Sequence, residues 1–157
     1  MVIVLGMIEK NDLNIVSLTF KDDFCDIGLE YVKGCGWKAG TSLGKKIRNC
    51  EFEDYERVFI LKHSNNIIGY CTFTKKDGID VNYEPFIGYV FIDEEYRGQR
   101  LSEKLIKHCE GYALELGFGD VYIISDHEGL YEKFGYDYFE KGIDKKGREE
   151  KIFRKKL

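Results

Sequence analysis

The sequence predicts a mixed α/β fold, an α+β arrangement in which helices flank a mostly antiparallel sheet. Two apolar runs, residues 58–61 and 67–73, are separated by a short polar turn, which is typical of an antiparallel hairpin. Apolar residues recur at three-residue and four-residue steps through 101–116, which is the period of an amphipathic helix. Strands on both sides of that helix, at 86–92 and 121–124, require a crossover connection, so we expect one parallel pair within the sheet.

Three elements are predicted before the hairpin. Residues 1–5 are apolar and are expected to form a first strand. Residues 22–33 carry a helical pattern, and Thr41 can cap a short helix over 41–48. The glycine-rich stretch 34–40, which includes a tryptophan, connects these two helices.

The elements after the hairpin follow from apolar runs and the glycines or polar turns between them. Gly117 and Gly119 stop the long helix, whose apolar stripe extends to Leu116. In chain order we expect a strand at 86–92, a helix at 101–116, a strand at 121–124, a short helix at 130–134, a strand from Tyr136, a glycine-rich turn and a last strand around 152–153.

The composition bounds the class of protein. A length of 157 residues, with 43% hydrophobic and 33% charged residues, predicts a single globular domain over 1–157. The net charge of −4 gives no general attraction to nucleic acid or anionic membranes. Five scattered cysteines, without a C-x-x-C pair, favour reduced thiols over a disulfide framework or a metal site. No signal peptide or membrane span is recognised, so we expect a cytoplasmic protein.

The segment from Asp93 to Ser102 lies between a buried strand and the long helix. Such a turn points free helix N–H groups away from the carboxyl end of the strand and binds anions. Gly98 permits a left-handed backbone, and Arg97 and Arg100 add positive charge. Pyrophosphate would suit this turn. The alternative is a solvated arginine-rich turn, and the spacing alone does not decide between the two.

Two segments resemble signatures of a known family. Residues 87–102 read IGYVFIDEEYRGQRLS, and residues 129–136 read GLYEKFGY. The first resembles motif A of the GNAT superfamily of N-acetyltransferases, Arg/Gln-x-x-Gly-x-Gly/Ala, and the second resembles the family's LYEK-x-GF helix and turn. The two segments also occur in the same order, and at a similar separation, as the two signatures of the family. The chain departs from the pattern at its second glycine, which is Arg100 here, and at its final Gly/Ala, which is Ser102.

The resemblance implies a fold in which two parallel central strands separate into a V-shaped cleft, with acetyl-CoA as cosubstrate. No metal is expected, because the histidines form no metal-binding pattern with the scattered cysteines. It implies that the pantetheine lies beside the strand and that the strand-to-helix turn holds the pyrophosphate. The implied contacts with the cosubstrate are Val90, Ile92, Arg97, Gly98, Gln99, Arg100, Leu101 and Ser102. An asparagine that often precedes the second signature is absent, and Ser125 or Asp126 could substitute for it.

Tyr131 is the candidate general acid, since the resemblance implies that it lies near the sulfur. Transfer from a thioester to an amine expels a thiolate, whose conjugate thiol has a pKa of about 8.5. A phenol with a pKa of about 10 stays protonated at neutral pH and can donate to that thiolate. The alternative is a core aromatic packed beside Leu130 and Phe134.

The base that accepts the proton of the attacking amine is not decided by the sequence. Glu84, Asp126 and Glu128 are three candidates, and each could equally be a surface carboxylate. A backbone amide of the separated strand is expected to stabilise the oxyanion.

The resulting hypothesis is an N-acetyltransferase that moves the acetyl group of acetyl-CoA to a primary amine in a ternary complex. A catalytically silent acyl-CoA-binding or partner-binding module on the same fold is the alternative, because two glycine positions are altered. The acceptor, a small-molecule or protein amine, would be selected by residues 24–46, which carry no readable signature. No nucleic-acid or membrane partner is expected, and a homodimer is compatible with the resemblance.

Overall fold

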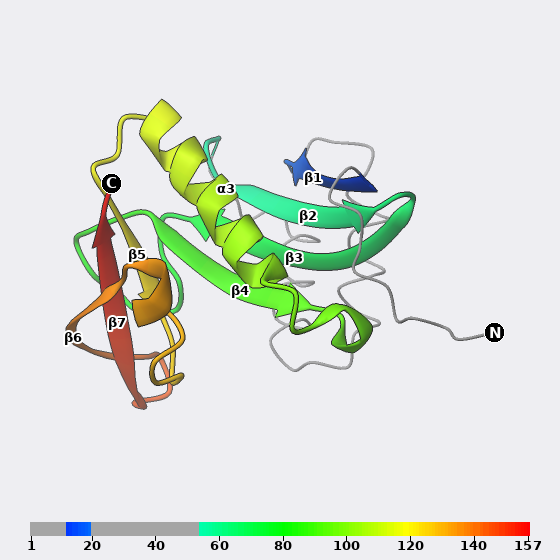
Figure 1. The fold of residues 1–157 in the computed structure, drawn as a ribbon. Coiled ribbons are helices and arrows are strands. Elements are labelled where there is room, and N and C mark those ends of the chain that lie inside the picture. Colours follow the sequence, from blue (N-terminus) through cyan, green and yellow to red (C-terminus); the bar gives the residue numbers. More distant parts are fainter. Residues whose placement is uncertain (1–11, 20–53) are drawn as a thin grey trace.

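The computed structural model describes residues 12–19 and 54–157. Within these residues, one seven-stranded sheet has the order β1-β2-β3-β4-β5-β7-β6 (Figure 1). Its strands are β1 Leu13–Leu18, β2 Arg57–His63, β3 Asn66–Thr74, β4 Phe86–Ile92, β5 Asp120–Ile124, β6 Asp137–Ile143 and β7 Glu149–Lys156. The β4–β5 pair is parallel and the other neighbouring pairs are antiparallel. The predicted mixed sheet is confirmed.

Helix α3, Leu101–Glu115, lies across one face of the sheet (Figure 1). Its apolar stripe packs on β3, β4 and β5 and forms the main core with residues such as Phe59, Phe73 and Ile123. The helix ends where Gly117 adopts φ of 90°, as predicted. Leu116 was expected in the buried stripe, but it is 41% exposed because it lies beyond the last helical turn.

Three short elements differ from the sequence prediction. Strand β1 was not predicted, since its alternation is weak and its partner β2 decides its conformation. The helix expected at 130–134 is the shorter 3₁₀ helix η3, Glu132–Phe134, and a further 3₁₀ helix, η2, spans Glu94–Tyr96. The strand predicted at 1–5 and the helices predicted at 22–33 and 41–48 lie outside the described residues.

The parallel strands β4 and β5 separate after a short contact. Pairing is confined to Phe86 with Tyr122 and Ile87 with Ile123. Beyond this point β4 continues to Ile92 along β3, without β5 as a neighbour, while β5 continues along β7. A bulge in β4, where Tyr89 has φ of 49°, accompanies the separation. The two strands therefore enclose a wedge-shaped gap at their carboxyl ends.

The opposite face of the sheet carries two smaller apolar clusters. One contains Leu18, Val58, Ile60 and Tyr70. The other contains Ile79, Phe86, Tyr122 and Ile152. Of the helices that the structure describes, none is both long and apolar enough to cross a membrane.

Candidate active site

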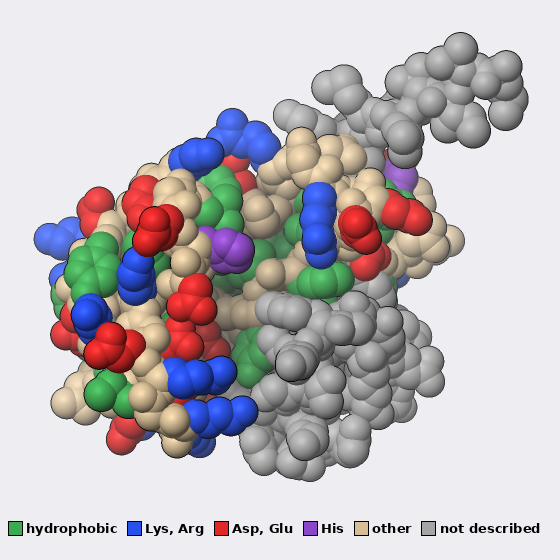
Figure 2. Space-filling view, turned by 90° about the horizontal axis from the view of Figure 1, so that it is seen from below, with side chains coloured by type: hydrophobic (Ala, Val, Ile, Leu, Met, Phe, Trp, Pro, Cys, Tyr) green, Lys and Arg blue, Asp and Glu red, His purple; other side chains and the backbone are tan. Residues whose placement is uncertain are grey.

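A cleft of about 970 Å³ lies between the end of β4 and the segment that follows β5. Its walls are residues 90–98 and 100–102, together with His127 and Leu130. In Figure 2 the molecule is hollowed on the face seen from below, and charged side chains of both signs lie near the hollow. The volume is at the upper end of the range usual for ligand pockets, about 300–1,000 Å³.

The amino end of α3 contributes unpaired backbone donors to this cleft. Among the residues that the structure describes, no side chain caps the helix. Helix geometry leaves the N–H groups of Leu101, Ser102 and Glu103 without intrahelical acceptors, and the helix dipole makes this end positive. A group with negatively charged oxygens would find hydrogen-bond donors here.

Two left-handed residues shape the turn that leads into α3. Gly98 has φ of 84°, and Arg100, the N-cap, has φ of 58° and ψ of 30°. Arg100 thus takes a backbone conformation that favours glycine, at the position where the family pattern has its second glycine. For an arginine, this conformation costs backbone strain.

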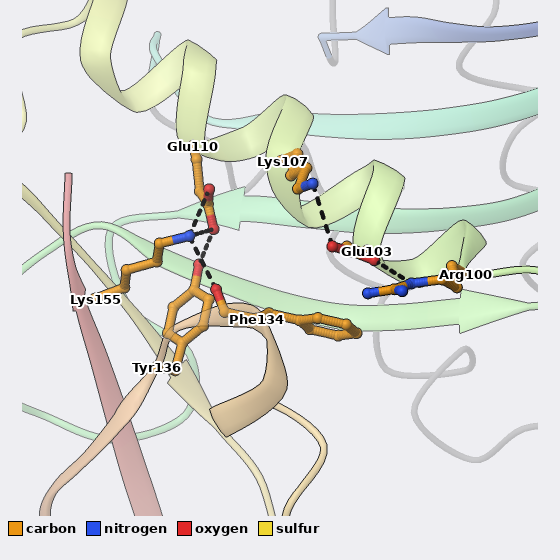
Figure 3. Close-up of polar contacts among 7 residues, drawn as sticks. All are labelled: Arg100, Glu103, Lys107, Glu110, Phe134, Tyr136 and Lys155. Carbon is orange, nitrogen blue, oxygen red and sulfur yellow. Dashed lines mark hydrogen bonds and ion pairs between the residues drawn. The ribbon is translucent and has the colours of Figure 1, made fainter.

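The two arginine side chains are engaged within the turn. Arg97 Nε donates to the carbonyl oxygen of Ile92 at 2.9 Å, and its guanidinium lies 5.7 Å from the centre of the Phe91 ring. Arg100 Nε lies 2.6 Å from Glu103 Oε2, on the exposed side of the helix (Figure 3). Hydrogen bonds from Arg100 and Lys107 lower the pKa of Glu103 below its usual value.

The structure brings seven of the eight predicted cosubstrate residues to one cleft. They are Val90, Ile92, Arg97, Gly98, Arg100, Leu101 and Ser102. Gln99 belongs to the same turn but does not line the cleft, because it lies between two residues of left-handed conformation that redirect the chain.

Tyr131 lies behind the wall of the cleft, next to the lining residue Leu130. It is 7% exposed, and its ring contacts those of Phe134, Tyr136 and Phe153. Burial raises the pKa of Tyr131, a hydrogen bond with Ser125 opposes this, and the Asp77 carboxylate adds to the rise. The phenol is therefore protonated at neutral pH.

A network of polar contacts fixes the turn that carries Tyr131 (Figure 3). The Tyr131 carbonyl accepts hydrogen bonds from the N–H groups of Phe134 and Tyr136 at 3.0 and 3.1 Å. Tyr136 Oη donates to Glu110 of α3 at 2.9 Å. Lys155 Nζ of β7 donates both to Glu110 and to the carbonyl of Phe134. These contacts join α3 and β7 to the turn at 131–136.

The three predicted candidates for the base lie outside the cleft lining. Glu84 accepts a hydrogen bond from Tyr55 Oη at 2.9 Å, and Glu128 is paired with Lys151. Asp126 hydrogen-bonds Glu150, whose pKa is raised by burial and by that carboxylate.

One carboxylate near Tyr131 was missed by the sequence analysis. Asp77, in the loop before β4, lies against the backbone of Gly88. The available signal was Gly88 itself, since an isolated glycine inside a strand marks a bulge or a close approach of other atoms.

Comparison with known proteins identifies the family. The model of the acetyltransferase (GNAT) family matches residues 29–136. The chain therefore belongs to the GNAT acetyltransferase family and is an acyltransferase enzyme, as its two signatures predicted. Acetyl-CoA is the cosubstrate of this family. No curated protein matches the chain.

Solved structures share the fold at low sequence identity. An acetyltransferase from Streptococcus agalactiae is 14% identical with a TM-score of 0.67, covering 93% of this chain and 99% of that one. An N-acetyltransferase from Staphylococcus aureus is 12% identical with a TM-score of 0.70, covering 92% and 97%. A spermidine/spermine N-acetyltransferase from Vibrio cholerae is 16% identical with a TM-score of 0.61, covering 92% of each chain.

Proposed function

We propose that this chain moves the acetyl group of acetyl-CoA to a primary amine by direct transfer within a ternary complex. The observation that carries the proposal is a cleft in which the start of α3 meets the part of β4 that is not paired with β5. This combination offers donors for a pyrophosphate at one end and a strand edge for an extended amide chain at the other.

The residues present fit a coenzyme A group. The N–H groups at the start of α3, with the Gly98 turn, would hold the pyrophosphate. Beyond Ile87, β4 has no pairing with β5, so the backbone near Val90 and Ile92 could hydrogen-bond the amides of the pantetheine as a neighbouring strand would. Bound in this way, the cosubstrate would supply a thioester as the acetyl donor.

We assign proton donation to Tyr131. Its raised pKa holds the proton until the thiolate develops, and the network of Glu110, Tyr136 and Lys155 restricts the turn on which it lies. A backbone amide of the separated part of β4 would stabilise the oxyanion, since its donor is not used in pairing with β5.

The second candidate function is a silent acyl-CoA-binding or partner-binding module. The observation that favours it is the presence of Arg100 and Ser102 at positions where the family pattern has small residues. The left-handed conformation of Arg100 opposes it, because this is a conformation that glycine also adopts readily.

The experiment that separates the two measures acetyl-CoA affinity by calorimetry and thiol release with a panel of primary amines. We expect both binding and amine-dependent thiol release. Binding without thiol release across polyamines, aminoglycosides, amino acids and peptide N-termini would instead establish the module.

A further inference from the structure

We propose that Asp77 receives the acceptor amine on the sheet face opposite α3, and that the acceptor is a cationic amine without a nearby carboxylate. This inference rests on the proposed acetyl transfer. It concerns the side of the wedge that the cosubstrate cleft does not use.

The first observation is the close contact between Asp77 and β4. A Cβ atom at Gly88 would lie 2.6 Å from Asp77 Oδ2 and 2.9 Å from its Cγ, so the carboxylate occupies the space of the absent side chain. Gly88 follows directly after Ile87, the last β4 residue paired with β5. The carboxylate is therefore located where the two parallel strands begin to separate.

The second observation is a buried hydroxyl on the neighbouring strand. Thr72 of β3 is paired with Gly88 and is 1% exposed. Its Oγ1 is the one buried side-chain N or O atom, within the described part of the chain, that has no hydrogen-bond partner. A buried hydroxyl without a partner is costly, and a ligand with N–H groups would satisfy it.

Strand alternation places this hydroxyl and the carboxylate on one face. Cys71 faces α3, since its Sγ lies 3.4 Å from that of Cys109 in the helix. Thr72, the next residue, therefore points away from α3. In β4 the core residue Ile87 points toward α3, so the side-chain position of Gly88, which Asp77 fills, also points away. Paired positions on one face lie about 5 Å apart at Cβ.

The loop that carries Asp77 is anchored by contacts both before and after this residue in the chain. The N–H of Lys75 donates to Glu56 Oε2 at 3.1 Å, and Thr74 Oγ1 donates to the carbonyl of Lys76 at 3.0 Å. Ile79, two residues after Asp77, bridges to Asp144 and is buried against Phe86. A carboxylate held in place can orient a substrate, because little further ordering is needed when the substrate binds.

Asp77 and Tyr131 approach the gap from opposite sides of the sheet. Tyr131 belongs to the core on the α3 side, yet the Asp77 carboxylate contributes to its raised pKa. An amine at Asp77 and a thioester sulfur near Tyr131 would thus face each other across the point where the strands separate. Direct transfer requires this arrangement.

The chemistry balances with these two groups. The ammonium gives one proton to Asp77, its nitrogen bonds to the acetyl carbon, the C–S bond breaks, and the sulfur takes a proton from Tyr131. The nitrogen loses a second proton, which restores Tyr131 through water, and Asp77 releases its own to solvent. The products are an N-acetyl amide, the thiol and one proton.

The class of acceptor follows from the negative charge of two carboxylates near the proposed amine position. Asp77 and the buried Glu56, which precedes β2 and accepts a hydrogen bond from the N–H of Lys75 in the Asp77 loop, attract an ammonium group and repel a carboxylate attached near it. Monoamines and polyamines fit this environment better than free amino acids do.

The test uses the full chain with n-butylamine, spermidine and β-alanine as acceptors. Asp77→Asn preserves the shape of the side chain, and Asp80→Asn is the matched control, because Asp80 lies in the same loop with its side chain 91% exposed. We expect wild type and Asp80→Asn to acetylate n-butylamine or spermidine and to leave β-alanine unmodified. In Asp77→Asn, kcat/KM for the amine should fall at least 100-fold, while the Kd for acetyl-CoA changes less than twofold.

Gly88→Ala provides a second route to the same result. Its methyl group would take the place of the Asp77 carboxylate and displace it, so amine turnover should fall while acetyl-CoA still binds. Wild-type kcat/KM in folded Asp77→Asn would overturn the proposal and leave the acetyltransferase function standing, as would preferential acetylation of β-alanine. A wild type that binds acetyl-CoA but acetylates no amine overturns both.

Discussion

The two ends of the proposed active site are built in different ways. The end formed by the Gly98 turn and the start of α3 offers backbone N–H groups, and Arg100 adopts a left-handed conformation there at a glycine position of the family pattern. The end near Tyr131 relies on individual side chains held by Glu110 and Lys155. Backbone donors tolerate changes of side chain, whereas side-chain donors do not, so substitutions should have unequal effects at the two ends.

The largest effect is expected from Tyr131→Phe. If the hydroxyl protonates the thiolate, kcat should fall about 10²–10³-fold, the usual contribution of such catalysis, and the Kd for acetyl-CoA should change little. Steady-state kinetics and calorimetry measure the two quantities. A role in core packing alone predicts nearly unchanged kcat, because phenylalanine fills the same volume. That result, with the chemical step rate-limiting, would remove Tyr131 from catalysis.

Glu110→Gln tests the network that supports the same end. Glu110 accepts hydrogen bonds from Tyr136 and Lys155 in a partly buried setting. Loss of its charge should reduce the free energy of unfolding by about 2 kcal/mol, since bonds to charged groups contribute about 1.5–3 kcal/mol. Urea denaturation measures this effect. Glu115→Gln, on the same helix, is the control, and equal stability of the two variants would contradict the network.

Gly98→Val probes the backbone end. A Cβ at this position would meet no atom within 4 Å, so the cost comes from φ of 84° and not from crowding. A β-branched residue there costs about 1 kcal/mol or more, and we expect weaker acetyl-CoA binding in calorimetry. Gly111→Ala is the control, since Gly111 lies in α3 with equally open space and without positive φ. Unchanged acetyl-CoA affinity in folded Gly98→Val would exclude this turn from the site.

Alkaline pH should lower the free energy of unfolding through Tyr136, which lies at the Tyr131 end of the proposed site. Burial and the Glu110 carboxylate raise the pKa of Tyr136, so the folded state keeps a proton that the unfolded state loses above a pH of about 10. The stabilisation is complete below that pH and decreases as the pH rises, by up to about 1.4 kcal/mol per pH unit. Unfolding free energies at pH 8 and pH 11 should show a smaller decrease in Tyr136→Phe. An identical decrease in both proteins would refute this contribution.

Arg100→Gly should have the smallest effect. Glycine removes the strain of φ of 58° but increases the entropy of the unfolded chain, and the ion pair with Glu103 is exposed. We expect a change in unfolding free energy within about 1 kcal/mol, and a change in acetyl-CoA Kd of less than threefold. A much larger loss of affinity would show that the Arg100 side chain, and not only its N–H, contacts the cosubstrate.

The sequence determined the elements whose pattern is local. The hairpin of β2 and β3, the long helix and the crossover between parallel strands follow from apolar periodicity, because a buried face imposes its spacing on the chain. The turn between β4 and α3 was equally readable, since Gly98 and the arginines are contiguous. These local signals predicted one end of the proposed site.

Only the tertiary structure decided which distant residues meet. Three features depend on how the chain packs in space. They are the separation of β4 from β5 after Ile87, the burial that raises the pKa of Tyr131, and the contact of Asp77 with Gly88. The sequence offered Glu84, Asp126 and Glu128 as bases because they lie near the signatures, whereas the carboxylate at the gap comes from an irregular loop. Loop conformation depends on packing against the sheet, which no local spacing of residues encodes.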